Sequence, residues 1–409
     1  MLACDGESCT GCMACASACN KNAISPVEDE HGFTHPYVDK SLCVSCGKCA
    51  KVCPVNVQHK YKQTDEIYAC WQLDGKKRFE ATSGGTFMTI AEKFITDGGV
   101  VYGAAFDDAF EVKHIRVDNI NDLIRLRGSK YVQSTTSGIF ESVKADLQND
   151  IRVLFSGTPC QVSALKNYLG KDFEGLYTID IVCHGVPSPR VFKDYLTVIK
   201  NKYEEGIASI SFRYKKPCWS VFSMRIQFTD GQKYIANKFK DPFLYFFLAE
   251  GGDLTLRKSC FQCRFTSPER DGDITLGDFW GITAERYSQR GIEKGVGLML
   301  VNSKKGSELF NNISNQLYVE KRDWSDAHRS NKSFSAPWKQ PEKFNQFWDY
   351  YNKNGFERSA NKFCDPVVAK AEMRLRFNGA LRRSHAYFLP YPIRKLLKTI
   401  KVKIKRMSS

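Results

Sequence analysis

Residues 9–19 read Cys-Thr-Gly-Cys-Met-Ala-Cys-Ala-Ser-Ala-Cys, and residues 43–54 repeat the spacing as Cys-Val-Ser-Cys-Gly-Lys-Cys-Ala-Lys-Val-Cys-Pro. Both stretches follow the pattern C-x2-C-x2-C-x3-C, and together they hold eight of the 16 cysteines. Residues 1–62 are too few to bury a conventional apolar core. The repeated spacing therefore predicts that bound metal holds this segment together.

This repeat resembles the bacterial-type two-[4Fe–4S] ferredoxin module. Four thiolates hold each cubane cluster of that module, and the fourth cysteine of each run ligates the other cluster. The resemblance implies two ligand sets, which are Cys9, Cys12, Cys15 and Cys53, and Cys43, Cys46, Cys49 and Cys19.

Two alternatives for these cysteines stay open. Structural zinc also uses paired C-x-x-C sites with four thiolates. The spacing Cys4-x4-Cys9-x2-Cys12 imitates a plant-type cluster, and Asn20 stands where the first run would usually end in proline. The complete duplication of the spacing favours two cubane clusters over both alternatives.

The composition is that of an ordinary folded protein with two or three domains. The chain has 409 residues, of which 42% are hydrophobic and 26% are charged. No apolar run is long enough to span a bilayer, and the first residues lack the apolar stretch of a secretory signal. We therefore expect a cytoplasmic protein, in which clustered cysteines serve metal binding or redox chemistry rather than disulfides.

The fold class expected for the whole chain is α+β, with residues 63–345 forming a mixed α/β domain. Apolar runs at 100–106, 152–155 and 177–182 predict strands, and amphipathic stretches ending at 169 and 203 predict helices after two of them. Thr82 or Ser83 is expected to cap a helix that ends near Gly98. Alternation at 207–214, 220–229 and 232–239 predicts an antiparallel insert.

The positive charge is concentrated at the C-terminus. The net charge is +15, and residues 371–409 alone carry +10. Residues 346–409 are expected to be helical, with a basic amphipathic helix at 393–406. This tail contacts an anionic membrane surface, at the inner face of the cell membrane, or is simply solvated. No nucleic-acid partner is indicated, because aromatic and basic residues are not interleaved.

Several short motifs of the α/β region suit an anionic ligand. Residues 83–86 read Ser-Gly-Gly-Thr before a helix, which presents backbone N–H groups and hydroxyls to an anion. Residues 127–130, Arg-Gly-Ser-Lys, bring two cations beside a flexible backbone. Taken alone, a Gly-Gly pair more often marks a plain turn, and an Arg-x-x-Lys pair more often lies on a solvated surface.

Together with Gly157-Thr-Pro-Cys-Gln161, Cys183-His-Gly-Val-Pro-Ser-Pro189 and Gly277-Asp-Phe-Trp-Gly281, these motifs resemble the coenzyme F420 hydrogenase/dehydrogenase beta-subunit family. The resemblance covers about residues 1–360. It implies an α/β domain that binds FAD, with iron–sulfur clusters feeding the flavin. The residues expected to bind this cofactor are Ser83, Gly84, Gly85, Thr86, Arg127, Ser129, Lys130, Tyr131, Gln133 and Thr158.

Four more cysteines lie in the family-like motifs, and their number suits a third [4Fe–4S] cluster. They are Cys160, Cys183, Cys260 and Cys263. The alternatives are a redox-active cysteine and ordinary buried thiols. Lys258 and Arg264 flank the C-x2-C pair and favour thiolate there.

Two residues are candidates for catalysis. His184 follows a predicted strand and is a candidate proton donor, with a hydrogen-bonded structural histidine as the alternative. Asp278 either orients a cofactor ring or caps the following Trp280-Gly281 turn. Phe279 and Trp280 stack on a flavin or pack in the core.

We therefore expect an iron–sulfur flavoprotein oxidoreductase. It passes electrons from a ferredoxin-like or other low-potential donor through two [4Fe–4S] clusters to FAD, and on to an organic acceptor such as a small molecule or glycan precursor. The alternatives are a subunit that reduces or oxidises coenzyme F420, in which Arg125, Arg127 and Lys130 receive the acidic tail, and a non-catalytic electron-transfer adapter. The third alternative is a cluster-bearing scaffold that regulates an assembly at the membrane and binds no flavin.

Overall fold

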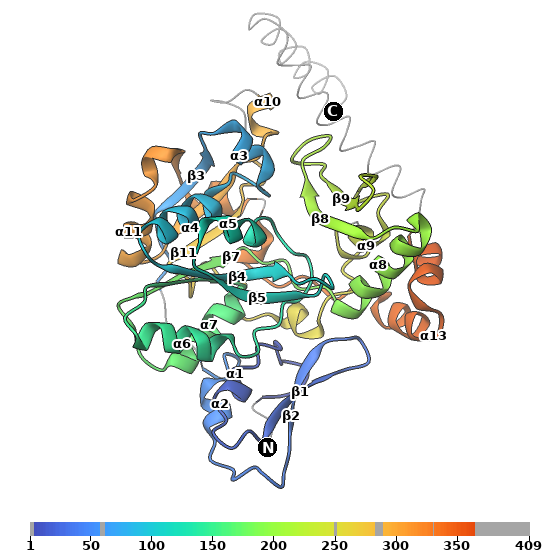
Figure 1. Ribbon diagram of the computed structural model, residues 1–409, viewed down its shortest axis with the longest axis horizontal. Coiled ribbons are helices and arrows are strands. Elements are labelled where there is room, and N and C mark those ends of the chain that lie inside the picture. Colours follow the sequence, from blue (N-terminus) through green and yellow to red (C-terminus); the bar gives the residue numbers. More distant parts are fainter. Residues whose placement is uncertain (1–3, 58–61, 249–251, 283–288, 330, 365–409) are drawn as a thin grey trace, which may run out of the picture.

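An eight-stranded sheet forms the centre of the computed structural model, which describes residues 4–57, 62–248, 252–282, 289–329 and 331–364 (Figure 1). Four neighbouring strands, β11, β7, β6 and β4, run parallel, and the outer strands pair antiparallel. In spatial order the strands are β13 (Leu317–Arg322), β3 (Ile67–Gln72), β12 (Gly297–Val301), β11 (Ile274–Asp278), β7 (Leu176–Ile181), β6 (Val153–Gly157), β4 (Val100–Phe106) and β5 (Val112–Val117). The predicted mixed α/β architecture is confirmed.

Helices cover both faces of this sheet because the apolar side chains alternate along its strands. Val101 and Leu154 pack with α4 (Thr86–Thr96) and α11 (Lys304–Asn311). Tyr102 and Phe155 point the other way, toward α6 (Ile139–Gln148) and α7 (Pro159–Leu169). The shorter helices are α3 (Gly75–Glu80), α5 (Ile120–Leu123), α10 (Gln289–Ile292) and α12 (Trp324–His328).

The predicted helix cap at Thr82 or Ser83 is wrong. Helix α4 begins after Gly85, whose φ of 97° lets the chain turn into the helix without a side-chain cap. The Thr82 hydroxyl instead accepts a hydrogen bond from the Ser129 amide at 2.9 Å, and the Ser83 hydroxyl donates to the Val296 carbonyl at 2.8 Å. The first amides of α4 therefore have no side-chain acceptor.

The predicted antiparallel insert forms a separate three-stranded sheet, in the order β10-β9-β8. Its strands are β8 (Ile207–Tyr214), β9 (Ser223–Phe228) and β10 (Lys233–Asn237). It shares an aromatic-rich core with the helices α8 (Pro189–Tyr203), α9 (Pro242–Leu248) and α13 (Phe344–Phe363). The basic helix expected at 393–406 lies outside the described residues.

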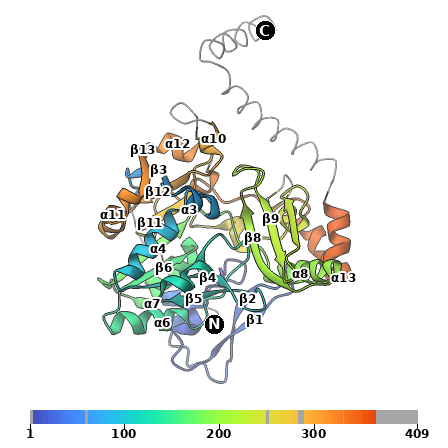
Figure 2. The ribbon, with the colours of Figure 1, turned by 45° about the horizontal axis from the view of Figure 1, so that its top comes forward.

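The cysteine-rich module packs beneath the large sheet, next to α6 and α7 (Figures 1 and 2). It contains the hairpin β1 (Ile24–Glu28) and β2 (Thr34–Val38) and the short helices α1 (Ala14–Ser17) and α2 (Lys48–Val52). Cys12 and Ala14 belong to the same buried cluster as α6 and α7, so the module and the α/β region share a core. Among the described residues, no helix combines the length and apolar character that a membrane crossing requires.

Gly84 lies where the chain passes close to strand β3 and to Gly297 of β12. A Cβ atom there would stand 2.4 Å from the Cys70 carbonyl oxygen and 2.8 Å from the Gly297 nitrogen. We predict that Gly84→Ala lowers the free energy of unfolding by ~1–3 kcal/mol, the usual cost of overpacking. Thermal unfolding measures this change. Gly75→Ala is the matched control, because no atom lies within 4 Å of its added methyl. Equal melting temperatures for the two variants would contradict the prediction.

Candidate functional site

A cavity of about 840 Å³ lies between the large sheet and the three-stranded sheet. Its wall includes the loops that follow β6, β7 and β11, together with Arg213 of β8 and Phe247 of α9. Loops after the carboxyl ends of parallel strands are the usual ligand site of such sheets. The volume is within the range of small-molecule and cofactor sites.

All but one of the residues expected to bind the cofactor line this cavity. Those on the wall are Ser83, Gly84, Gly85, Thr86, Arg127, Ser129, Lys130, Tyr131 and Thr158. Gln133 is absent from the lining, because its side-chain amide donates to the Thr10 carbonyl at 3.1 Å and accepts from Arg257 at 3.1 Å. The sequence motif therefore combines cavity residues with one residue that contacts the cysteine-rich module.

The cavity offers two features that suit a phosphate group. The uncapped N-terminus of α4, an eleven-residue helix, lies at its wall, where unpaired amides and the helix dipole favour an anion. The Lys130 ammonium donates to the carbonyls of Arg125 at 2.9 Å and Arg127 at 3.1 Å. Burial, and secondarily the Arg127 charge, lowers the pKa of Lys130 to about 7, and a bound anion would favour its charged form. Arg127 itself pairs with Glu80.

Asp278 lies on the cavity wall but its carboxylate is occupied. Arg213 donates to both of its oxygens, at 2.8 and 3.2 Å, and the Trp219 indole donates at 2.8 Å. Arg213 also donates to the Tyr131 hydroxyl at 2.9 Å. The Asp278 carboxylate therefore fixes a buried guanidinium in the wall. The sequence motifs did not include Arg213, because it lies in a strand whose alternation indicates only an antiparallel sheet.

His184 lines the same cavity. Its Nε2 atom lies 2.6 Å from an oxygen of Asp253, and its ring packs 4.5 Å from the ring of Trp338. The contact with Asp253 matches the alternative of a hydrogen-bonded structural histidine. Because His184 lines the cavity, it also lies where a proton donor to a bound substrate would have to be.

A second, smaller cavity of about 40 Å³ adjoins the first and contains the four cysteines of the family-like motifs. We call Cys160, Cys183, Cys260 and Cys263 the cavity cysteine set. The two cavities share Thr158 and residues 183–186. Thr10, from the first cysteine run, also lines the smaller cavity.

The chemistry of the cavity cysteine set fits a metal cluster. Burial raises the pKa of Cys160 and of Cys260 to about 12, and the neighbouring cysteines of the set add to the rise. Without metal these thiols are therefore neutral, and a coordinating metal deprotonates them. Among the described residues, no three His, Cys, Asp or Glu side chains are grouped to hold a single metal ion. The set could hold a [4Fe–4S] cluster, which takes four thiolates.

The inner cysteine set, Cys9, Cys12, Cys15 and Cys53, is buried where the module meets the α/β region. Burial raises the pKa of Cys12 and of Cys15 to about 12. The thiols of Cys12, Cys9 and Cys53 also raise the pKa of Cys15. All four cysteines of the inner set are therefore neighbours. Cys160 adds to the rise at Cys12, so the inner set adjoins the cavity cysteine set.

Cys4 lies beside the inner set, where its thiol hydrogen-bonds with Cys9 and Cys53. This bond, with smaller contributions from His35 and Arg257, holds the pKa of the Cys9 thiol below its usual value although burial opposes it. Cys4 thus lies close to Cys9, as the plant-type alternative requires. It lies equally beside Cys53, which belongs to the second cysteine run.

The outer cysteine set, Cys19, Cys43, Cys46 and Cys49, is nearer to solvent. Cys46 is exposed, and the other three are half-buried. The outer set is therefore the most exposed of the three, the inner set is the most buried, and the cavity cysteine set is half-buried. An exposed outer set suits the entry of electrons from the surface.

Two family matches were found for the chain. Residues 8–57 match the 4Fe-4S dicluster domain, and residues 150–327 match the C terminus of the coenzyme F420 hydrogenase/dehydrogenase beta subunit. Both parts of the resemblance drawn from the motifs are confirmed. The dicluster match supports two [4Fe–4S] clusters over structural zinc in the N-terminal module.

Proteins similar to this chain include an enzyme and a chain of a solved complex. The coenzyme F420-dependent sulfite reductase of Methanocaldococcus jannaschii is 22% identical over 319 residues, which are 76% of this chain and 46% of that protein. The chain thus spans about half the length of that relative. A solved structure of the F420-reducing [NiFe] hydrogenase complex from Methanosarcina barkeri covers 74% of this chain and 91% of its own matched chain, with 12% identity and a TM-score of 0.44.

The cavity cysteine set makes a testable prediction about iron content. Anaerobically purified protein should contain about twelve iron atoms per chain, four for each of three clusters. We predict that Cys260→Ser removes about four of them, because a cubane loses one of its four thiolates. Iron and sulfide analysis measures the change.

Cys218→Ser is the matched control, since Cys218 is a half-buried cysteine outside the three sets. It should retain all the iron. A wild-type protein with about eight iron atoms, unchanged by Cys260→Ser, would show that the cavity cysteine set binds no cluster.

Proposed function

We propose that this chain, which joins a 4Fe-4S dicluster domain to a C-terminal domain of the F420 hydrogenase/dehydrogenase beta-subunit family, is an iron–sulfur flavin oxidoreductase. Its cysteine sets hold [4Fe–4S] clusters, and its large cavity binds FAD together with an organic partner. When bound, the clusters supply one-electron transfer and the flavin supplies exchange between one-electron and two-electron chemistry.

One observation carries this proposal. The outer, inner and cavity cysteine sets run in order from exposed Cys46 to the wall of the large cavity. Thr10 belongs to the first cysteine run and also lines the cavity of the third set. Residues 183–186 line both cavities. Redox groups held by these residues would therefore be neighbours.

The chain's own residues position the ligand of the large cavity. The amides at the start of α4, with Lys130 and Arg127, receive the anionic part. The apolar wall, which includes Phe222, Phe247 and Trp280, excludes water from the ring system. This combination of an anion site and an aromatic wall suits FAD, and it equally suits the deazaflavin coenzyme F420.

Two compounds are candidates for the electron acceptor. Coenzyme F420 is favoured by the matched family and by the name of the curated relative, which is an F420-dependent enzyme. A glycan precursor, which comes from the family resemblance, is the second candidate. Turnover of purified protein with reduced F420 and an artificial one-electron acceptor separates the two. A chain that needs a further subunit for any turnover would instead be an electron-transfer adapter.

Flavin retention tests the proposed cofactor site. We predict that Arg127→Ala binds flavin about ten-fold more weakly, since one charge-assisted hydrogen bond contributes ~1.5 kcal/mol or more. Fluorescence of flavin released on denaturation measures retention. Arg125→Ala is the control, because Arg125 is two residues away and does not line the cavity. Wild-type protein that releases no flavin would exclude FAD, and equal retention by both variants would exclude Arg127 from the site.

We also propose that the electron donor docks at the outer cysteine set. The segment from β2 to α2, residues 39–47, runs along the bottom of the molecule in Figure 1. Leu42 is 50% exposed and Val44 is 61% exposed, and the exposed Lys40 and Lys48 flank them. Small interfaces of this kind are typical of transient electron-transfer complexes, and the lysines would complement an acidic one-electron carrier.

If the donor docks at the outer cysteine set, the charge of Lys48 should affect the rate of cluster reduction. Lys48→Glu should slow reduction of the clusters by an acidic ferredoxin several-fold and weaken the dependence of that rate on salt, because steering is lost. Stopped-flow absorbance at low and high ionic strength measures both effects. Lys200→Glu, at an exposed position of α8, is the matched control. Equal rates for the two variants would place the donor elsewhere.

A further inference from the structure

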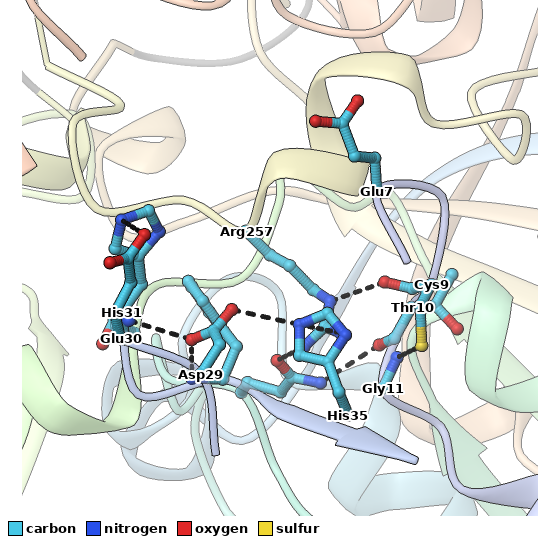
Figure 3. Close-up of polar contacts among 12 residues, drawn as sticks. Glu7, Cys9, Thr10, Gly11, Asp29, Glu30, His31, His35 and Arg257 are labelled. Atoms are coloured by element: carbon cyan, nitrogen blue, oxygen red, sulfur yellow. Dashed lines mark hydrogen bonds and ion pairs between the residues drawn. The ribbon is translucent and has the colours of Figure 1, made fainter. Parts of the chain in front are cut away.

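Arg257 is a buried cation at the junction of the module and the α/β region. Its side chain is 2% exposed. Its Nε atom donates to the Cys9 carbonyl at 2.7 Å, and Nη1 donates to the Gln133 side-chain oxygen at 3.1 Å. Nη2 lies 3.1 Å from Nε2 and 3.3 Å from Nδ1 of His35 (Figure 3). Three segments distant in the sequence thus meet at one guanidinium.

None of these acceptors carries a negative charge. The closest carboxylate of the network, Asp29, is bonded to His35 at 3.0 Å rather than to Arg257. In the described part of the chain, Arg257 forms no ion pair with an Asp or Glu side chain. A buried guanidinium without a counter-charge is costly, so a negative group is expected close to it.

The cysteines around Arg257 identify that negative group. Arg257 lines the smaller cavity together with all four cysteines of the cavity cysteine set, and its carbonyl accepts a hydrogen bond from the Cys260 amide at 2.9 Å. Its side chain also holds the backbone of Cys9, a member of the inner set, at 2.7 Å. Arg257 therefore acts on the inner set and on the cavity cysteine set together. A [4Fe–4S] cluster with four thiolates is net negative and gains a further negative charge on reduction.

We propose that Arg257 is a positioning residue that supplies the counter-charge for reduced clusters in the inner and cavity cysteine sets. Net charge and hydrogen bonds set the reduction potential of such clusters. A cation at this junction makes the inner cluster easier to reduce than it would be without Arg257. This favours the inward movement of electrons that arrive at the outer set. The proposal rests on the dicluster function, but not on the identity of the cofactor or acceptor in the large cavity.

Arg190 provides a control that distinguishes the effect of the Arg257 charge from the attachment of the module to the α/β region. Arg190, at the start of α8, donates to the Glu30 carbonyl at 2.6 Å and to Asn352 at 2.8 Å. A Cβ on Gly32 would stand 2.2 Å from the Arg190 Cβ, so the hairpin turn of the module is tightly packed on it. Arg190 thus holds the module to the α/β region through a backbone carbonyl, as Arg257 does, and it lines neither cavity.

The experiment is a redox titration of the full-length protein under anaerobic conditions, followed by electron paramagnetic resonance. Cys46→Ser identifies the signal of the outer cluster. Arg257→Met should shift the midpoint potential of the inner cluster to more negative values and leave the outer cluster unchanged. Arg257→Lys, which keeps the charge, should restore most of the shift. Arg190→Met should leave both potentials unchanged.

Each result decides the proposal. An unchanged inner potential in Arg257→Met, with iron retained, would overturn it, and so would an equal shift in Arg190→Met. If the Arg257→Met protein loses iron, the Gln133→Glu variant is titrated in its stead. Its carboxylate would lie beside Nη1 and offset the charge of Arg257 without removing the arginine. An unchanged inner potential in that variant would also overturn the proposal. Wild-type protein without iron would instead overturn the dicluster function on which it rests.

Discussion

Three backbone carbonyls of the first cysteine run are each held by a side chain from the α/β region. Arg257 donates to Cys9, Gln133 donates to Thr10, and the Thr136 hydroxyl donates to Cys12 at 2.8 Å. Cysteine loops have little core of their own, so their shape depends on such outside donors. These bonds fix the run that supplies most of the inner set against the wall of the smaller cavity. The rest of the site depends on this junction, because it brings the module and the α/β region into one redox unit.

The three cysteine sets differ in their surroundings. Cys46 is exposed, whereas Cys12 belongs to a buried apolar cluster with α6 and α7, and Cys160 lines the smaller cavity. In a low-dielectric interior each charge acts more strongly on its neighbours than in water. A single buried cation such as Arg257 can therefore influence two cysteine sets, while lysines near the outer set act mainly on the approach of a partner. A positive side chain thus has different consequences at the buried junction and at the exposed outer set.

Local patterns predicted much of the fold, and tertiary contacts account for what they missed. The strand at 100–106 and the strand at 207–214 were predicted with their observed bounds, because continuous apolar runs and alternation are properties of the chain itself. The cap of α4 was wrong because Gly85 replaces a side-chain cap with its backbone conformation. Arg213 and Arg257 carry no local signature, since their roles come from partners more than 60 residues away. Gln133 sits within a cofactor-like motif and yet contacts the module, which only the folded chain reveals.

The cavity cysteine set shows why strand order matters for this chemistry. Cys160 follows β6 and Cys183 follows β7, and these parallel neighbours end at the same edge of the sheet. Cys260 belongs to a 3-10 segment, Lys258–Gln262, whose preceding residue is Arg257. A metal cluster bound by this set would tie two strand ends to the segment that holds the N-terminal module. Metal binding to neutral buried thiols releases protons and contributes its free energy to folding. Cluster assembly and docking of the module are therefore expected to be coupled.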